Sequence, residues 1–123
     1  MPSSSRLRVA VIGLGWWGQT VVRYLKTARN IDIICACDLN TELATRFAQT
    51  EAIALASGFE AVLANPQVQA VVLCTPHSLH TEQIVAAAQA GKHVFCEKPL
   101  TLTRADALRA VAAVNAQGLV LAV

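Results

Sequence analysis

The sequence predicts an α/β fold in which a doubly wound parallel sheet lies between two layers of helices, a three-layer αβα arrangement. Short apolar runs, such as residues 9–12 and 71–73, alternate along the chain with segments of helical periodicity. Runs of this kind are typical of parallel strands that helices cover on both faces. Hydrophobic residues make up 54% of the 123 residues and charged residues only 15%, which is enough apolar surface for the core of one domain.

The first half of the chain is predicted to form three strands and three helices. Gly13 ends the first strand, Asp38 closes the second, and Asn65-Pro66 is a strong stop for the third helix. We therefore expect strands at 6–12 and 31–37, a weak strand at 52–55, and helices at 16–28, 41–49 and 58–64.

The second half continues the same alternation. Gly91 is expected to end one helix as a C-cap glycine, and Thr103 is expected to cap the start of the next. The expected strands are 68–74, 93–96 and 119–123, and the expected helices are 78–90 and 103–116. Residues 1–5 are expected to form a flexible polar tail. Residues 6–123 then form one domain that is cut off in or after its sixth strand, because an apolar run ends the sequence.

A glycine motif, Gly13-Leu14-Gly15-Trp16-Trp17-Gly18, joins the first predicted strand to the first predicted helix. In this context the three glycines are typical of a turn that binds the pyrophosphate of a dinucleotide at a helix N-terminus. The sequence thus predicts a Rossmann-type fold, with strand order 3-2-1-4-5-6. The rings of Trp16 and Trp17 either flank the cofactor or pack against neighbouring loops.

Asp38 lies twenty residues after Gly18, at the end of the second predicted strand. A carboxylate there accepts hydrogen bonds from the adenosine ribose and repels a 2′-phosphate, and no arginine follows to compensate. The expected cofactor is therefore NAD rather than NADP. The alternative interpretation is that the glycines only form turns and that Asp38 caps a helix.

Two later stretches follow the carboxyl ends of predicted strands, where open α/β sheets bind ligands. They are Cys74-Thr75-Pro76-His77-Ser78-Leu79-His80 and Gly91-Lys92-His93-Val94-Phe95-Cys96-Glu97-Lys98-Pro99-Leu100. Together with the glycine motif and Asp38, they resemble the Gfo/Idh/MocA family of oxidoreductases. The resemblance extends from Leu7 to Val123, and Glu97-Lys98-Pro99 is its most diagnostic part.

The resemblance implies an NAD(P)-binding domain of an oxidoreductase that acts on CH–OH groups. Hydride would pass between NAD(P) and a hydroxyl or carbonyl carbon of a sugar, cyclitol or similar polyhydroxylated compound. Members of this family carry a second α/β domain, expected to be absent here, which supplies further catalytic residues and usually mediates homo-oligomer formation. The present chain is therefore expected to bind NAD weakly and not to turn over substrate alone.

The resemblance also assigns roles to residues. Lys98 is the expected catalytic residue beside the nicotinamide, Glu97 could orient it, and the family commonly has a cis peptide before Pro99. Thr75, His77 and His80 would lie near the ribose and nicotinamide. The family often has Asn at the position of His77, and His80 is alternatively a structural residue of the first helical turn. The expected cofactor-binding residues are Gly13, Leu14, Gly15, Trp16, Trp17, Gly18, Asp38, Cys74, Thr75, Pro76, His77, His80, Glu97 and Lys98.

Composition excludes several other classes of protein. The net charge is only +2 and the basic residues are scattered, so neither a nucleic acid nor a membrane surface is an expected partner. No apolar run approaches the roughly 20 residues that span a bilayer. The four cysteines lie in apolar runs without metal-site spacing, which predicts reduced thiols in a cytoplasmic protein and no metal.

Three alternatives remain open from the sequence. The chain could be a non-catalytic NAD(P)-binding or regulatory module, which would need no Lys98. It could be the Rossmann half of another dehydrogenase class, or a purely structural interaction domain. The stretch Thr75-Pro76-His77-Ser78-Leu79-His80 and the stretch Glu97-Lys98-Pro99 disfavour another dehydrogenase class, and the special residues at ligand-side strand ends disfavour a purely structural domain.

Overall fold

The computed structural model describes residues 6–123, so the expected tail at residues 1–5 lies outside the described residues. Five parallel strands form one sheet in the order β2-β1-β3-β4-β5. The strands are β1 (Leu7–Ile12), β2 (Ile31–Cys37), β3 (Ala70–Leu73), β4 (His93–Cys96) and β5 (Leu121–Ala122). The helices are α1 (Trp16–Leu25), α2 (Thr41–Glu51), α3 (Phe59–Ala64), α4 (His80–Gln89) and α5 (Arg104–Ala116).

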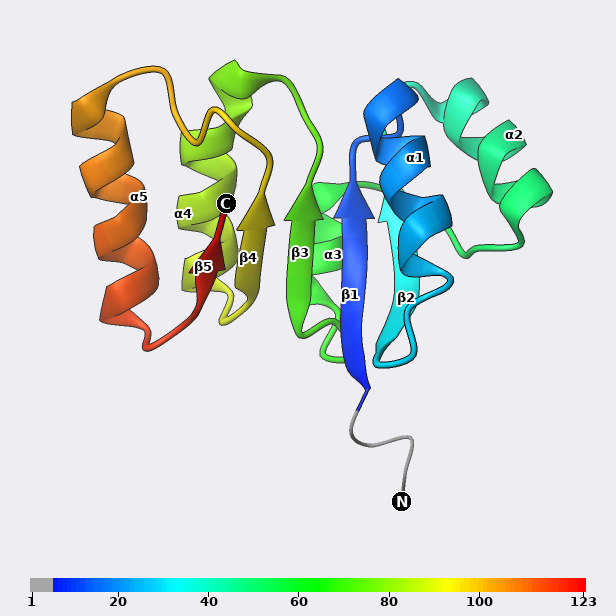
Figure 1. Ribbon diagram of the computed structural model, residues 1–123, viewed down its shortest axis with the longest axis horizontal. Coiled ribbons are helices and arrows are strands. Elements are labelled where there is room, and N and C mark those ends of the chain that lie inside the picture. The colour runs from blue at the N-terminus through cyan, green and yellow to red at the C-terminus, as the bar shows by residue number, and fades with distance from the viewer. Residues whose placement is uncertain (1–5) are drawn as a thin grey trace.

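The helices lie on both sides of the sheet, as Figure 1 shows. Helix α1 lies in front of β1 and β2, whereas α3 and α4 lie behind the sheet and α5 packs beside α4. Connections between parallel strands are right-handed, so the direction of each step along the sheet decides which face the helix covers. The step from β1 to β2 places α1 on one face, and the steps in the opposite direction, toward β3, β4 and β5, place α3, α4 and α5 on the other. The predicted Rossmann-type α/β fold is confirmed.

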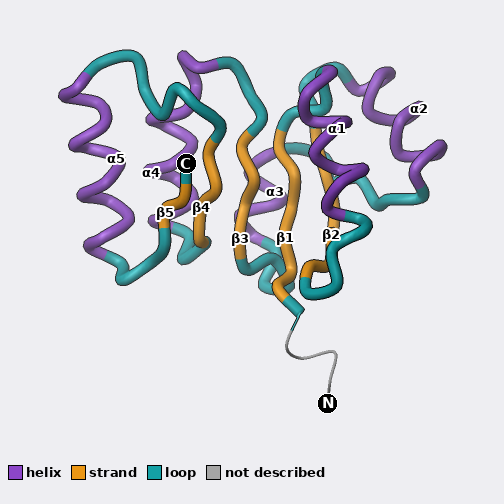
Figure 2. The backbone as a smooth tube through the Cα atoms, in the orientation of Figure 1, coloured by secondary structure: helices purple, strands orange, loops and turns teal. Residues whose placement is uncertain are grey.

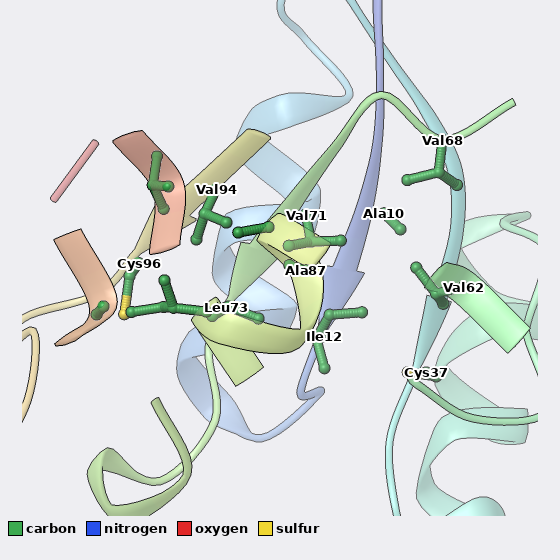
Figure 3. Packing of buried hydrophobic residues seen from close by; sticks show 14 of the residues in the cluster. Ala10, Ile12, Cys37, Val62, Val68, Val71, Leu73, Ala87, Val94 and Cys96 are labelled. Atoms are coloured by element: carbon green, nitrogen blue, oxygen red, sulfur yellow. The ribbon is translucent and has the colours of Figure 1, made fainter. Parts of the chain in front are cut away.

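Buried side chains on the two faces of the sheet form two separate apolar clusters. On β1, Val9 and Val11 belong to the cluster on the α1 side, and Ala10 and Ile12 belong to the other. Neighbouring residues of a strand point to opposite faces, so one buried strand supplies both clusters. Figure 3 shows the second cluster, in which Leu73 of β3 lies near Ala87 of α4.

The weak strand expected at residues 52–55 is not present as a strand. Ala52 ends α2 in the left-handed conformation, at φ 57°, and the following segment makes one parallel bridge, between Leu55 and Ala36 of β2. Two backbone hydrogen bonds hold it there: Ala36 N–H donates to Ala54, and Ala56 N–H donates to Ala36. The bridge lies on the outer edge of β2, the place that the predicted strand order gives to this segment.

Several elements are shorter than expected (Figure 2). Helix α1 ends at Leu25 rather than at Ala28, because the chain tightens into turns in which Thr27 N–H donates to Tyr24. A 3-10 turn at His77–Leu79 precedes α4, so the α-helix begins at His80 instead of Ser78. Strands β3 and β5 keep only residues 70–73 and 121–122 of the expected runs.

The helix ends follow simple capping chemistry. The Thr103 hydroxyl accepts a hydrogen bond from the N–H of Asp106 at 3.1 Å, which confirms it as the N-cap of α5. The side chain of Asn40, rather than Asp38, caps α2 by accepting from Leu43 N–H. Gly91 follows α4 at φ 77°, a conformation that favours glycine, as the sequence predicts.

One face of the sheet is partly uncovered. No helix lies in front of β3, β4 and β5 in Figure 1, and a groove of about 710 Å³ runs there beside α1. Its lining is apolar apart from His93 and Glu97, and it includes Trp17, Tyr24 and Phe95. Within residues 6–123, no helix has both the length and the apolar character needed to cross a membrane.

Candidate cofactor-binding site

The glycine turn connects the end of β1 to the start of α1, and its three glycines meet different surroundings. Gly13 has φ 97°, and a Cβ there would lie 2.6 Å from the carbonyl oxygen of Cys74. A Cβ on Gly18 would lie 1.8 Å from the carbonyl oxygen of Gly13. Only glycine fits either position, so the turn and the close approach of α1 to β1 depend on both.

Gly15 differs because a Cβ there would meet no atom within 4 Å. It is the N-cap of α1, provides no side-chain cap, and is followed by a first turn without an acidic residue. A helix N-terminus of this kind presents backbone N–H groups and a positive dipole end to open space, which suits a phosphate group. The cradle therefore fits the pyrophosphate of a dinucleotide.

Asp38, directly after β2, is hydrogen-bonded to the glycine turn. Its Oδ2 accepts from the N–H of Leu14 at 2.5 Å, and its Oδ1 accepts from the N–H of Asn40 at 2.8 Å. These bonds fix the carboxylate beside the turn while each oxygen keeps a further lone pair for a ligand hydroxyl. The sequence did not indicate the bond to Leu14.

A pocket of about 650 Å³ lies between the glycine turn, the end of β2 and the loop after β3. Eight of the expected site residues line it: Gly13, Gly15, Trp16, Trp17, Asp38, Cys74, Thr75 and Pro76. Asp38 is the only charged residue of this lining. Trp16 is 79% exposed and Trp17 43% exposed, so both rings stand at the surface beside the turn.

The other expected site residues lie around the pocket without lining it. Leu14 and Gly18 are buried within the turn, and His77 is exposed on the 3-10 turn. His80 is fully buried, Lys98 is exposed on the loop after β4, and Glu97 lines the apolar groove together with Trp17.

Sequence reasoning missed several residues that line the pocket. Leu39 and Leu79 directly neighbour expected site residues, so proximity in sequence was the available signal. The others lie at or just before the starts of α2 and α3, in α4, or at the ends of β1 and β2: Thr41, Ser57, Gly58, Phe59, Gln83, Ile12 and Cys37. Nothing in their local sequence distinguishes them from ordinary loop and core residues.

The loops after β3 and β4 lie side by side because these strands are neighbours in the sheet. Glu97 N–H donates to the carbonyl of Leu73 at 3.2 Å, which holds the start of the Lys98 loop at the end of β3. The Thr75 hydroxyl is hydrogen-bonded to Gln83 Oε1 at 2.5 Å. The peptide bond between Lys98 and Pro99 is cis, as the resemblance implied. The carboxyl ends of β1, β3 and β4 thus bring the predicted motifs to one edge of the sheet (Figure 1).

Two cysteines, Cys37 and Cys74, line the pocket, and burial favours the neutral thiol in both. Burial, with smaller contributions from Glu97 and Cys96, raises the pKa of Cys74 to about 12. A neutral thiol is a poor nucleophile and a poor metal ligand. Across residues 6–123, no group of three or more His, Cys, Asp or Glu side chains could hold a metal ion.

The fold and the pocket together define an NAD(P)-binding Rossmann domain. A profile described as "Oxidoreductase family, NAD-binding Rossmann fold" (GFO_IDH_MocA) matches residues 7–123. The chain therefore belongs to the Gfo/Idh/MocA family of oxidoreductases, as the N-terminal NAD-binding domain.

The chain spans about a third of the length of the relatives that it matches. Inositol 2-dehydrogenase of Gluconacetobacter diazotrophicus is 38% identical over 115 residues, which cover 91% of this chain and 34% of the relative. GenD2 from gentamicin A biosynthesis, solved with NAD, is 30% identical and superimposes with a TM-score of 0.90. The match covers 96% of this chain and 34% of the GenD2 chain. KijD10, a 3-ketoreductase of Actinomadura kijaniata solved with NADP and TDP-benzene, is 32% identical with a TM-score of 0.89 and covers 94% of this chain and 36% of its own.

Proposed function

We propose that this chain is the cofactor-binding part of an NAD-dependent dehydrogenase that acts on a hydroxyl or carbonyl carbon of a polyhydroxylated ring compound. The observation that carries the proposal is that three loops meet at one edge of the sheet. They are the glycine turn after β1, the loop after β3 that contains Thr75 (the Thr75 loop) and the loop after β4 that contains Lys98 (the Lys98 loop). The relatives named inositol 2-dehydrogenase and 3-ketoreductase support the substrate class and favour an enzyme over a non-catalytic module.

In this proposal a bound cofactor would supply the nicotinamide carbon that takes up or releases hydride. The turn at Gly15 and the N-terminus of α1 bind the pyrophosphate, and Asp38 accepts hydrogen bonds from the adenosine ribose. The Lys98 ammonium hydrogen-bonds the substrate oxygen and stabilises negative charge that develops there. Glu97 orients this amine, and Thr75 and His77 hold the nicotinamide end of the cofactor.

Asp38 also supports NAD over NADP. Its carboxylate is fixed by two backbone N–H groups, and no lysine or arginine lines the pocket to neutralise a 2′-phosphate. Trp16 and Trp17, the only two tryptophans, stand beside the turn, so their fluorescence reports cofactor binding. We expect NAD to quench this fluorescence at lower concentration than NADP, and tighter binding of NADP would contradict the preference.

Asp38→Asn tests the carboxylate directly. The amide oxygen can still accept from Leu14 N–H, whereas the charge and the bond from Asn40 N–H are lost. We expect the NAD preference over NADP to fall by about tenfold, which corresponds to roughly 1.4 kcal/mol. Glu42→Gln, an exposed change on α2, should leave the ratio of the two affinities as it is.

Lys98 is tested in a chimera in which residues 7–123 replace the matching domain of the Gluconacetobacter diazotrophicus inositol 2-dehydrogenase. If Lys98 acts on the reacting oxygen, Lys98→Ala lowers kcat by about 10²- to 10⁴-fold and leaves the Kd for NAD within threefold. Lys26→Ala, which removes an exposed lysine directly after α1, serves as the matched control. Equal loss of kcat in both variants, or unchanged kcat in Lys98→Ala, would refute the role.

Two further expectations accompany the proposal. The four cysteines are unpaired in the described structure, which supports a reducing compartment such as the cytoplasm. A homo-oligomer is proposed for the longer form of the protein, and light scattering on that form would test it.

A further inference from the structure

His80 joins the two loops that carry the later site residues. It is the first residue of α4 and its side chain is 0% exposed. Its Nε2 lies 3.0 Å from the carbonyl oxygen of Thr75. On the other side of the ring, Nδ1 lies 3.0 Å from the carbonyl oxygen of Pro99 and 3.1 Å from that of Leu100. One imidazole thus spans the loop after β3 and the loop after β4.

The partners of this ring decide what it can do. All three are carbonyl oxygens, which only accept, so the ring acts here as a hydrogen-bond donor. A neutral imidazole donates from one nitrogen, and a ring with hydrogen on both nitrogens donates to both loops. The ring is fully buried, and its loss would remove the one side-chain donor that these three carbonyl groups share.

The bonds of His80 fall directly beside Lys98. On the N-terminal side of Lys98, Glu97 N–H is bound to the end of β3 through Leu73. On its C-terminal side, Pro99 and Leu100 are bound to α4 through His80. The Lys98 side chain itself is exposed, so its position depends on the backbone that these bonds hold.

We propose that His80 is a positioning residue: it fixes the Lys98 loop against the Thr75 loop and so sets where the Lys98 amine stands relative to the bound cofactor. The inference rests on the proposed role of Lys98, and it replaces direct cofactor contact with an indirect role for His80. The buried place of the ring, outside the lining of the pocket, supports this assignment.

The first part of the proposal is that His80 fixes the Lys98 loop. Backbone order in the 123-residue chain tests it without any cofactor. His80→Phe keeps an aromatic ring but no donor, His80→Gln keeps one donor group, and His93→Gln removes a histidine from a different site. In the unaltered chain we expect NMR order parameters of about 0.85 for the amides of Lys98 and Leu100. They should fall below about 0.6 in His80→Phe and lie between these values in His80→Gln.

The amides of β1 report whether each variant is folded, and they should keep their order throughout, as should the Lys98 loop in His93→Gln. A Lys98 loop as ordered in His80→Phe as in the unaltered chain would overturn the proposal. So would a loss of order that spreads equally to β1 in both His80 variants, because His80 would then stabilise the whole fold rather than the loop.

The second half concerns the amine itself. The chain has three lysines, at positions 26, 92 and 98, so ¹³C-methylation of lysine gives few signals, and Lys98→Arg identifies the one of interest. NAD should shift the Lys98 signal in the unaltered chain. In His80→Phe, NAD should still quench tryptophan fluorescence with a Kd within threefold, while the Lys98 shift falls to less than half.

The outcomes separate this inference from the proposed function. A full Lys98 shift in His80→Phe would overturn positioning by His80. If NAD quenches fluorescence but leaves the Lys98 signal of the unaltered chain unchanged, the proposed role of Lys98 fails, and the order parameters alone decide whether His80 fixes the loop.

Discussion

At the scale of single residues, two glycines of the glycine turn have different roles, one in the stability of the fold and the other in cofactor binding. Gly18 lies against the carbonyl of Gly13, whereas Gly15 faces open space at the N-terminus of α1. A methyl group at Gly18 must push the helix away from the strand, and one at Gly15 meets nothing in the protein. The same change should therefore act on folding at one position and on the ligand at the other.

We expect Gly18→Ala to lower the free energy of unfolding by about 1–3 kcal/mol or more, the range for an overpacked site. Gly15→Ala should change it by less than about 0.5 kcal/mol but weaken NAD binding at least tenfold, because the methyl group stands where the pyrophosphate lies. Urea unfolding and fluorescence titration measure the two effects. Equal stability losses in both variants would contradict this division.

The buried thiols predict the response to alkaline pH. Burial raises the pKa of Cys37 to about 11, of Cys74 to about 12 and of Cys96 to about 11, from an ordinary value of 9.0. The folded chain thus keeps protons that the unfolded chain loses above pH 9, so the free energy of unfolding falls as pH rises from about 9 to 11. The lowered pKa of buried Lys92 acts in the opposite direction, but one amine does not offset three thiols.

Urea unfolding at pH 7.5 and pH 10 in the presence of a reductant would measure this loss. Cys74→Ala should reduce the difference between the two pH values, since it removes the thiol with the highest pKa. A midpoint that stays constant or rises between these pH values would show that the thiols ionise as easily in the folded chain as in the unfolded one.

At the scale of elements, Lys92 ties the connection after α3 to the start of β4. Its Nζ donates to the carbonyls of Asn65 and Val68, each at 2.8 Å, and the side chain is buried. Lys92→Met keeps most of the apolar stem but leaves the buried Val68 carbonyl and the partly buried Asn65 carbonyl without this donor, so we expect a loss of about 1–3 kcal/mol in stability. Lys26→Met, at an exposed lysine, should cost less than about 1 kcal/mol. Thermal and urea unfolding compare the two.

The elements also show where sequence patterns succeed and where they fall short. The strand at 31–37 was predicted to its exact bounds because seven apolar-rich residues are closed by Asp38. The strand expected at 52–55 was wrong because α2 extends to Glu51 and Ala52 ends that helix, so of this segment only Leu55 forms a bridge with β2. Lys92 was not singled out, because a lysine in a loop gives no local sign of burial.

At the scale of the whole molecule, the fold leaves an apolar groove uncovered beside α1. A parallel sheet normally has both faces covered, yet Tyr24 is 72% exposed and Phe95 40% exposed beside this groove. We expect the chain to bind the dye ANS and increase its fluorescence. The double change Tyr24→Lys and Phe95→Lys should reduce that increase, whereas Leu108→Lys, on the exposed side of α5, should not. No increase with the unaltered chain would show that this face is closed in solution.

The sequence by itself determined the alternation of strands and helices, the glycine turn and the family of this chain. Periodicity, turn glycines and an acidic residue at a strand end are local signals, because they depend on backbone geometry within a few residues. Only the tertiary structure decided that Asp38 binds Leu14 across 24 positions and that His80 holds Pro99 across 19. Such contacts arise when neighbouring strands place their loops together at one sheet edge, and no short stretch of sequence encodes that proximity.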